Sequence, residues 1–331
     1  GYTVAVIAGF LLTAVQNWTG MPTLTGNKLA GLCLLWIYGR ILPFYSDDLY
    51  DGLIALVDFA FLPVLAYQIS KPIFQSKHKK SLVFVGLLLL LTIGNGLIHA
   101  EFLGLKENTA WLGIRLVVAT IIMMILVISG RIFPFFTERG LSGTICIKSP
   151  TLDALSLGAA TLVFVLDFYD ILGVWLAMAG MAAAIFNFLR VRNWYVQRVW
   201  YIPLLWILYI GYGWIILGFV LMALKAFSLV LPTLSLHSFT MGGIGVLTLG
   251  MMARVSLGHT GRALKVATVM TIGFVLINLA VIARVLLPIA FAEWYSYLIY
   301  FSTAAWLAAF SLFASVYAPI LARPRADGKP G

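Results

Sequence analysis

Long apolar stretches, separated by short polar or charged segments, run along almost the whole chain. Bounding each stretch by charged residues and by Gly or Pro clusters predicts about eleven helical spans. They cover residues 1–16, 28–44, 52–70, 81–99, 110–130, 152–168, 171–189, 203–224, 235–256, 266–287 and 295–318. About 20 apolar residues are enough to cross the hydrocarbon core of a bilayer. The pattern therefore predicts an all-α fold, a polytopic integral membrane bundle of about eleven transmembrane helices.

Only loops separate the predicted spans, so residues 1–331 are interpreted as a single transmembrane domain that ends in a tail at residues 319–331. Asp167 and Asp170 interrupt one long apolar stretch and predict a tight turn between the sixth and seventh spans. The first apolar stretch, residues 2–15, covers only about 20 Å, which is less than the roughly 30 Å of a bilayer core. We therefore expect the front of this helix, and more, to be missing from the chain.

Composition favours lipid as the surroundings of this polypeptide. Hydrophobic residues make up 62% of the chain and charged residues only 10%, whereas soluble domains have about 45–50% and about 25%. The net charge of +10 could suggest a nucleic-acid partner. The basic residues, however, lie in short runs between apolar stretches rather than along one face, so nucleic acid is excluded as a partner. The expected partner is the lipid bilayer.

The basic residues also predict the orientation of the bundle. Alternate loops hold 17 of the 22 Lys and Arg residues, and the opposite loops hold the other five, Arg40, Lys106, Arg115, Lys225 and Arg284. Because cytoplasmic loops are enriched in Lys and Arg, the richer side is interpreted as cytoplasmic. This places Gly1 outside and the C-terminus in the cytoplasm of a multi-pass protein.

The chain contains only four histidines, and three of them lie at ends of predicted spans. His99 and His237 are expected at the outer face and His259 at the inner face, while His78 is interpreted as a solvated loop residue. Imidazole is a common ligand of haem iron and copper, so these three are candidate metal ligands. The alternative is that they only form hydrogen bonds at the membrane interface.

Distance along the chain separates two of these candidates. His237 and His259 are 22 residues apart, or about 33 Å along an unbroken helix. They cannot bind one metal ion unless the glycine-rich stretch at Gly242–Gly245 folds back, although close helix packing is the preferred interpretation of those glycines. Two sites, one near each face, are therefore expected.

Other polar residues inside the spans need partners. Asp58 lies within the third span and is interpreted as either internally hydrogen-bonded or part of a proton or ion pathway. Cys33 falls in an apolar span and Cys146 in a basic loop, so no disulfide is expected. No Walker loop, GxSxG, HExxH or dinucleotide fingerprint occurs in the sequence.

Three local strings, in this order, resemble the NnrS family of bacterial inner-membrane proteins that bind haem and copper and are linked to nitric oxide and denitrification. The first is Ala8-Gly9-Phe10-Leu11-Leu12-Thr13-Ala14-Val15, followed by Asn17-Trp18-Thr19-Gly20. The second is Gly130-Arg131 with Pro134-Phe135-Phe136-Thr137. The third is Met251-Met252-Ala253-Arg254-Val255 with Leu257-Gly258-His259-Thr260-Gly261-Arg262. The resemblance covers nearly the whole chain.

The resemblance implies about twelve helices in the complete protein, because the family has a further helix and a Trp-His-x-His-Glu-Met string before the segment that matches Gly1. Those histidines would lie outside, with His99 and His237. One departure concerns the eighth helix, where the family commonly has His-Leu-Gly-Tyr and this chain has Tyr209-Ile210-Gly211-Tyr212. Tyrosine can bind haem iron, so Tyr209 is either a substitute ligand or a sign that the inner site has lost one.

The function implied by the resemblance is that of a haem- and copper-binding inner-membrane protein that responds to nitric oxide or nitrosative stress. His99, His237 and His259 are the expected metal ligands, and nitric oxide is the expected small-molecule ligand. The cofactor-binding residues are expected to be Tyr209 and, as partners of haem propionates, Arg131, Arg254 and Arg262. Whether the protein turns over a substrate, and which electron donor it uses, are left open. The rival interpretation is a secondary transporter of a small solute or ion.

Overall fold

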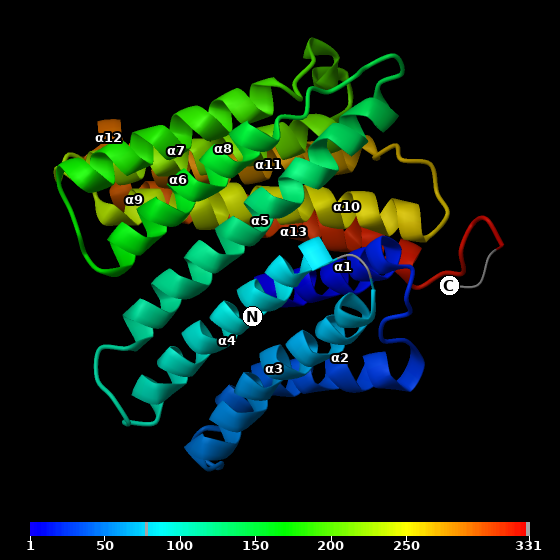
Figure 1. The fold of residues 1–331 in the computed structure, drawn as a ribbon, viewed down its shortest axis with the longest axis horizontal. Coiled ribbons are helices and arrows are strands. Elements are labelled where there is room, and N and C mark those ends of the chain that lie inside the picture. The colour runs from blue at the N-terminus through cyan, green and yellow to red at the C-terminus, as the bar shows by residue number, and fades with distance from the viewer. Residues whose placement is uncertain (77–78, 329–331) are drawn as a thin grey trace. The chain divides into compact units, whose positions relative to one another are not determined.

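The computed structural model describes residues 1–76 and 79–328, and all regular structure within them is helical (Figure 1). This confirms the predicted all-α fold. Three residues used in the sequence analysis, Lys77, His78 and Lys329, lie outside the described residues. The chain forms two compact units, Gly1–Met124 and Ile125–Gly331, and the boundary falls inside helix α5.

Unit 1 is organised around helix α3, which packs against three neighbours, α1, α2 and α4. Its longer helices are α1 (Tyr2–Thr19), α2 (Gly26–Ile41), α3 (Asp51–Gln75), α4 (Leu82–Phe102) and the first part of α5 (Ala110–Gly140). Two 3₁₀ turns join them, η1 (Leu42–Tyr45) and η2 (Lys79–Ser81).

Unit 2 is organised around helix α8 (Pro203–Lys225), which buries residues on every side of its axis. Figure 1 shows α6, α7 and α8 side by side in green, and α7 packs against both of the others. The remaining elements are the rest of α5, α6 (Pro150–Phe168), α7 (Val174–Arg192), η3 (Gln197–Tyr201), α9 (Pro232–His237), η4 (Ser238–Val246), α10 (Leu247–His259), α11 (Thr268–Val285), α12 (Leu287–Ala290), η5 (Ala292–Trp294) and α13 (Tyr295–Leu321).

Nine helices in residues 1–76 and 79–328 are long and apolar enough to cross a membrane. The chain is thus a multi-pass membrane bundle, but the predicted count of about eleven spans is not reproduced. The helices α1 and α2 exist and are not among the nine. Helix α1 ends in the polar segment Gln16–Thr19, and α2 has 16 residues that include Lys28 and Arg40. At the rise of an α-helix, α2 covers only about 24 Å.

The predicted turn between the sixth and seventh spans is confirmed. Helix α6 begins where the Ser149 side chain accepts the Leu152 N–H, with Pro150 in the first turn. It ends at Phe168, before a turn that contains two residues with positive φ, Asp170 and Gly173. Two antiparallel helices with a short connection result, as the interruption at the aspartates predicted.

Residues 232–259 form one continuous helical rod, which widens to a π-helix at Ser238–Val246. A methyl group at Gly242 would collide with the Trp214 side chain, and one at Gly245 with Trp306. These glycines therefore allow close contact with neighbouring helices, which confirms the predicted role. The stretch does not fold back on itself.

Candidate functional site

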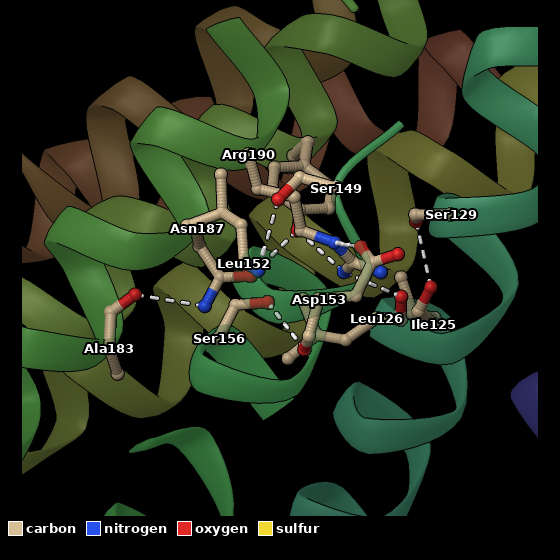
Figure 2. Close-up of polar contacts among 11 residues, drawn as sticks. Ile125, Leu126, Ser129, Ser149, Leu152, Asp153, Ser156, Ala183, Asn187 and Arg190 are labelled. Carbon is tan, nitrogen blue, oxygen red and sulfur yellow. Dashed lines mark hydrogen bonds and ion pairs between the residues drawn. The ribbon is translucent and has the colours of Figure 1, made fainter. Parts of the chain in front are cut away.

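The most completely buried charged group of unit 2 is Arg190, near the end of α7, whose side chain is 3% exposed. Its Nε donates to Asp153 Oδ1 at 2.5 Å, and Nη1 donates to the Leu126 carbonyl at 2.9 Å and to the Tyr212 hydroxyl at 3.2 Å (Figure 2). The guanidinium lies over the Trp194 ring at 5.0 Å. One arginine thus connects four helices, α5, α6, α7 and α8.

The polar contacts continue from Arg190 without leaving an unsatisfied group. Tyr212 donates its hydroxyl proton to Asn187 Oδ1 at 2.6 Å, and Asn187 Nδ2 donates to the Ala183 carbonyl at 2.8 Å. Figure 2 shows Asn187 and Arg190 on the same side of α7, facing Asp153 on α6. The cluster of Arg190, Asp153, Asn187 and Tyr212, here the inner cluster, pairs one positive with one negative charge. Buried polar groups arranged in this way fix the geometry of the helices that carry them.

Helix α5 continues ten residues beyond its predicted end at residue 130, through Pro134 to Gly140. Proline removes one helical hydrogen bond and crowds the carbonyl four residues earlier, which belongs here to Gly130. A methyl group at Gly130 would also overlap Arg190 Nη2. The Gly130-Arg131 string therefore places a residue without a side chain where the inner cluster needs room. Arg131 itself is exposed.

Tyr209 is buried and held by two hydrogen bonds. Its hydroxyl donates to the Trp194 carbonyl at 2.7 Å, so Thr137, 2.8 Å away, is the donor to its oxygen. These contacts bring the end of the Pro134–Thr137 string against the eighth long helix. Because both the proton and a lone pair of Tyr209 are engaged, the residue as it stands does not suit iron ligation. Its role as a cofactor ligand remains a prediction.

The third string lies at the end of α10. Arg254 is 7% exposed and stacks on the Phe136 ring at 3.8 Å. His259 is exposed at the last position of the helix, and its carbonyl accepts Nη1 of Arg325 at 3.0 Å. Arg262 folds back to the Thr260 carbonyl at 3.3 Å. The structure thus places Arg254 and His259 on one helix, with Arg262 three residues past its end.

In unit 1 the predicted partner of Asp58 is found. Its carboxylate forms an ion pair with Arg40 of α2, and its Oδ2 lies 2.9 Å from Nε2 of His99 on α4. The other ring nitrogen of His99, Nδ1, is buried and has no hydrogen-bond partner among the described residues. This cluster of Arg40, Asp58 and His99 therefore joins three helices of unit 1 through one carboxylate.

A second cluster that contains a histidine, formed by His237, Arg284 and Tyr295, lies in unit 2. Nη2 of Arg284 is 3.0 Å from His237 Nε2, and Nη1 donates to the Tyr295 hydroxyl at 3.1 Å. A guanidinium only donates hydrogen bonds, so it occupies the lone pair of His237 Nε2. A metal ion there would require Arg284 to move, and His237 in this arrangement does not suit a metal.

Two of the three histidines predicted as metal ligands, His237 and His259, are not brought together. His237 and His259 lie at the start and end of the rod of residues 232–259, so they cannot share a metal ion. His99 belongs to unit 1 and has its contacts there. Among residues 1–76 and 79–328, no group of three or more His, Cys, Asp or Glu is placed to hold a metal ion.

The inner cluster was not predicted from the sequence. Arg190 was counted only as one of the basic residues of the cytoplasmic side, and Asp153, Asn187 and Tyr212 were not singled out. A signal was available, because Asn187 and Arg190 are three residues apart and share a helix face with the small buried residue Ala183. Two polar side chains on a face that packs through alanine need internal partners.

Neither the curated proteins nor the solved structures contain a match to this chain. The family model described as "NnrS protein" matches residues 1–325, which is nearly the whole chain. This agrees with the three strings at residues 8–20, 130–137 and 251–262. The chain belongs to the NnrS family.

Proposed function

We propose that this protein is a metal-binding membrane protein of the bacterial inner membrane that responds to nitric oxide. Haem and copper are its proposed cofactors, nitric oxide its proposed ligand, and the C-terminus is assigned to the cytoplasm. Family membership supports the link to nitric oxide. The contacts of His99 are the observation in the chain itself that carries the proposal.

His99 has the arrangement expected of a metal-binding imidazole. Its Nε2 faces the Asp58 carboxylate, which can only accept, so the proton sits on Nε2 and the lone pair on Nδ1. A carboxylate on the second nitrogen is the usual partner of a histidine that binds a metal, because it fixes the tautomer and the ring orientation. Arg40 in turn holds the carboxylate. The residues present therefore fit a metal at Nδ1.

Room for a small ligand supports the same assignment. A cavity of about 120 Å³ lies beside this cluster, lined by Arg40, Asp58 and Asn95 together with apolar side chains such as Leu91 and Ile98. A bound iron or copper ion would supply coordination and electron exchange with a diatomic ligand. The chain's own residues orient the imidazole, balance the charge of Asp58 and limit the size of what enters.

On the inner side, His259 is the proposed ligand and Arg131, Arg254 and Arg262 are the proposed partners of haem propionates. The imidazole of His259 is exposed and forms no hydrogen bond with the described residues, so both of its nitrogens are available. Arginine suits a propionate because its planar fork pairs a carboxylate through two parallel hydrogen bonds. Arg254 and Arg262 flank His259 in the chain.

The test is the metal content and absorption spectrum of the purified full chain and of three variants. We expect a Soret band and bound metal in the parent. Metal affinity should fall about 10- to 100-fold in His99→Ala and in Asp58→Asn, which removes the orienting charge. Thr92→Ala, on the same helix as His99, is the matched control, because the Thr92 hydroxyl donates to the Leu88 carbonyl and does not line the cavity. It should keep the metal of the parent.

Equal metal content in the parent and in His99→Ala would remove His99 as a ligand. A colourless, metal-free parent would overturn the proposal as a whole and favour the rival function, a secondary transporter. His259→Ala should lower metal content independently of His99→Ala, since the two residues would serve separate sites.

A further inference from the structure

The charge of Arg284 is not neutralised in the described part of the chain. No carboxylate of these residues forms an ion pair with it. Its partners are His237 and Tyr295, and its guanidinium lies 5.5 Å from the centre of the Tyr295 ring. Glu293, two residues before Tyr295, is the nearest acid in the sequence, and its carboxylate makes no ion pair here. The cluster therefore keeps a full positive charge.

The protonation of the partners follows from the chemistry of the guanidinium. Because Arg284 can only donate, His237 Nε2 accepts, and the imidazole is neutral with its proton on Nδ1. The Tyr295 oxygen likewise accepts from Nη1, which leaves its own proton free to donate. Neither partner contributes negative charge, and both are held in orientations that leave a donor unused.

Donors in excess of acceptors are what an oxyanion requires. A guanidinium has five N–H groups, and two of those of Arg284 are used, one on Nη1 and one on Nη2. The remaining three, one on each nitrogen, can donate to the oxygens of an anion. Arg284 is only partly exposed and lies in a candidate membrane span, where an uncompensated cation is costly. An anion would relieve that cost.

We infer that Arg284, assisted by the Tyr295 hydroxyl and oriented by His237, binds an oxyanion at this end of unit 2. The shared chemistry is two oxygens on one central atom, as in a lipid phosphate or a small free anion such as phosphate or nitrite. The inference needs no bound metal and does not depend on the proposed function. If Arg284 bound no oxyanion, the metal content of the protein would be unchanged, and a protein without metal would still bind the oxyanion.

The experiment uses the full chain purified in a neutral detergent, with sodium chloride holding ionic strength constant. Sodium phosphate, sodium nitrite and micellar phosphatidylglycerol are titrated separately, and the thermal midpoint is followed by intrinsic fluorescence. A ligand that binds only the folded state raises the midpoint in a saturable way. We expect at least one of the three to do so in the parent protein.

In Arg284→Gln the apparent Kd should rise about tenfold or more, because a charge-assisted hydrogen-bond pair is lost. The matched control is Lys225→Gln, another outer-side cation, whose ammonium is already paired with Asp167 at 2.6 Å. This control should bind the anion as the parent does. Tyr295→Phe should weaken binding about threefold, and it serves as the test if Arg284→Gln fails to fold.

The arms of the titration identify the source of the anion. A response to phosphatidylglycerol alone supports a lipid phosphate, and a response to phosphate or nitrite supports a soluble anion. No saturable response in the parent, or identical responses in the parent, Arg284→Gln and Tyr295→Phe, would overturn the inference.

Discussion

Arg190 and Arg284 belong to the same unit, and each lies over an aromatic ring and donates to a tyrosine hydroxyl. They differ in their remaining partners. Arg190 has the Asp153 carboxylate and a backbone carbonyl, whereas Arg284 has a neutral imidazole. Arg190 therefore has its charge balanced from within the fold, and Arg284 does not. The difference suggests that the first arginine fixes helices and the second is left for a ligand.

The energetic consequences of the two arrangements are opposite. Removing one partner of a buried ion pair costs about 3–5 kcal/mol, since the other charge is left without compensation in a poorly solvated place. Removing a charge that has no counterion leaves nothing uncompensated. Substitutions at the two arginine clusters should therefore differ strongly in stability, which makes the comparison testable.

The largest effect is expected from Asp153→Ala. It leaves the guanidinium of Arg190, 3% exposed, without its carboxylate. Unfolding should become easier by about 3–5 kcal/mol, measured from the thermal or denaturant midpoint of the detergent-solubilised protein.

Substitution of Arg190, the other member of the ion pair, is the control for this assignment. Arg190→Met should cost less than Asp153→Ala, because the Asp153 side chain is 39% exposed and water can solvate it. The double variant should be more stable than Asp153→Ala alone, since no buried charge remains. A double variant as unstable as the sum of the two single ones would show that the pair is not coupled.

The next largest effect is expected from Gly130→Ala, whose new methyl group would meet Arg190 Nη2. Forcing extra volume into a packed site typically costs about 1–3 kcal/mol. Gly158→Ala in α6 is the matched control, because a methyl group there meets no atom within 4 Å. It should be neutral or stabilising by up to about 1 kcal/mol, as alanine is the better helix former. Equal midpoints for the two variants would contradict the close approach of Arg190.

Cys146 offers a chemical probe of the inner cluster. Its thiol is buried and donates to the Trp194 carbonyl at 3.5 Å, and Trp194 lies beneath Arg190. Burial, and then the carboxylate of Glu138, raise the pKa of the Cys146 thiol. The reactive thiolate is therefore scarce at pH 8 and becomes more abundant as the pH rises above the ordinary thiol range.

In a Cys33→Ser background, alkylation of Cys146 at pH 8 should be about tenfold slower than in the denatured chain. Asp153→Ala should accelerate it, because Arg190 loses the carboxylate that holds it over Trp194, while Arg284→Gln should not. The rates are measured by mass spectrometry after quenching. If Arg284→Gln alone accelerated the alkylation of Cys146, the thiol would report on the Arg284 cluster and not on the inner cluster, and the prediction would be wrong.

The smallest effect on stability is expected from Arg284→Gln in the absence of added oxyanions. No ion pair is broken, so the midpoint should stay within about 0.5 kcal/mol of the parent or rise slightly. A loss comparable with that of Asp153→Ala would mean that Arg284 is a structural arginine after all, and the contrast between the two clusters would disappear.

Most of the helices could be predicted from the sequence because apolar length and charged boundaries are local properties. The turn at Asp167 and Asp170 was predicted correctly for this reason. The count of spans was too high since α1 and α2 are helical yet too short or too polar to meet the requirement for crossing. The extension of α5 was missed because proline is expected to end a helix. Pro134 is tolerated inside it, since the residue four positions earlier is Gly130.

The clusters could be predicted only in part, because partners come from helices far apart in the chain. The need of Asp58 for a partner was evident from its position, but nothing local identifies Arg40 and His99 as the partners. Arg190 follows the cytoplasmic charge rule. Its spacing from Asn187 indicates a buried polar face, but nothing local identifies Asp153, 37 residues earlier in the chain, as its partner. The ligand roles of His99, His237 and His259 remain predictions.

The widened stretch Ser238–Val246 has a consequence for how this protein can change over time. A π-turn holds one residue more than the α-turn it replaces, so deleting a residue there restores an ordinary turn. The segment beyond it would keep its facing, with Arg254 still directed at Phe136. The same deletion in α8, which is α-helical throughout, would rotate every later residue of that helix by about 100° around its axis. A one-residue deletion should therefore be tolerated at Ser238–Val246 and should disrupt the fold of this membrane protein when it falls in α8.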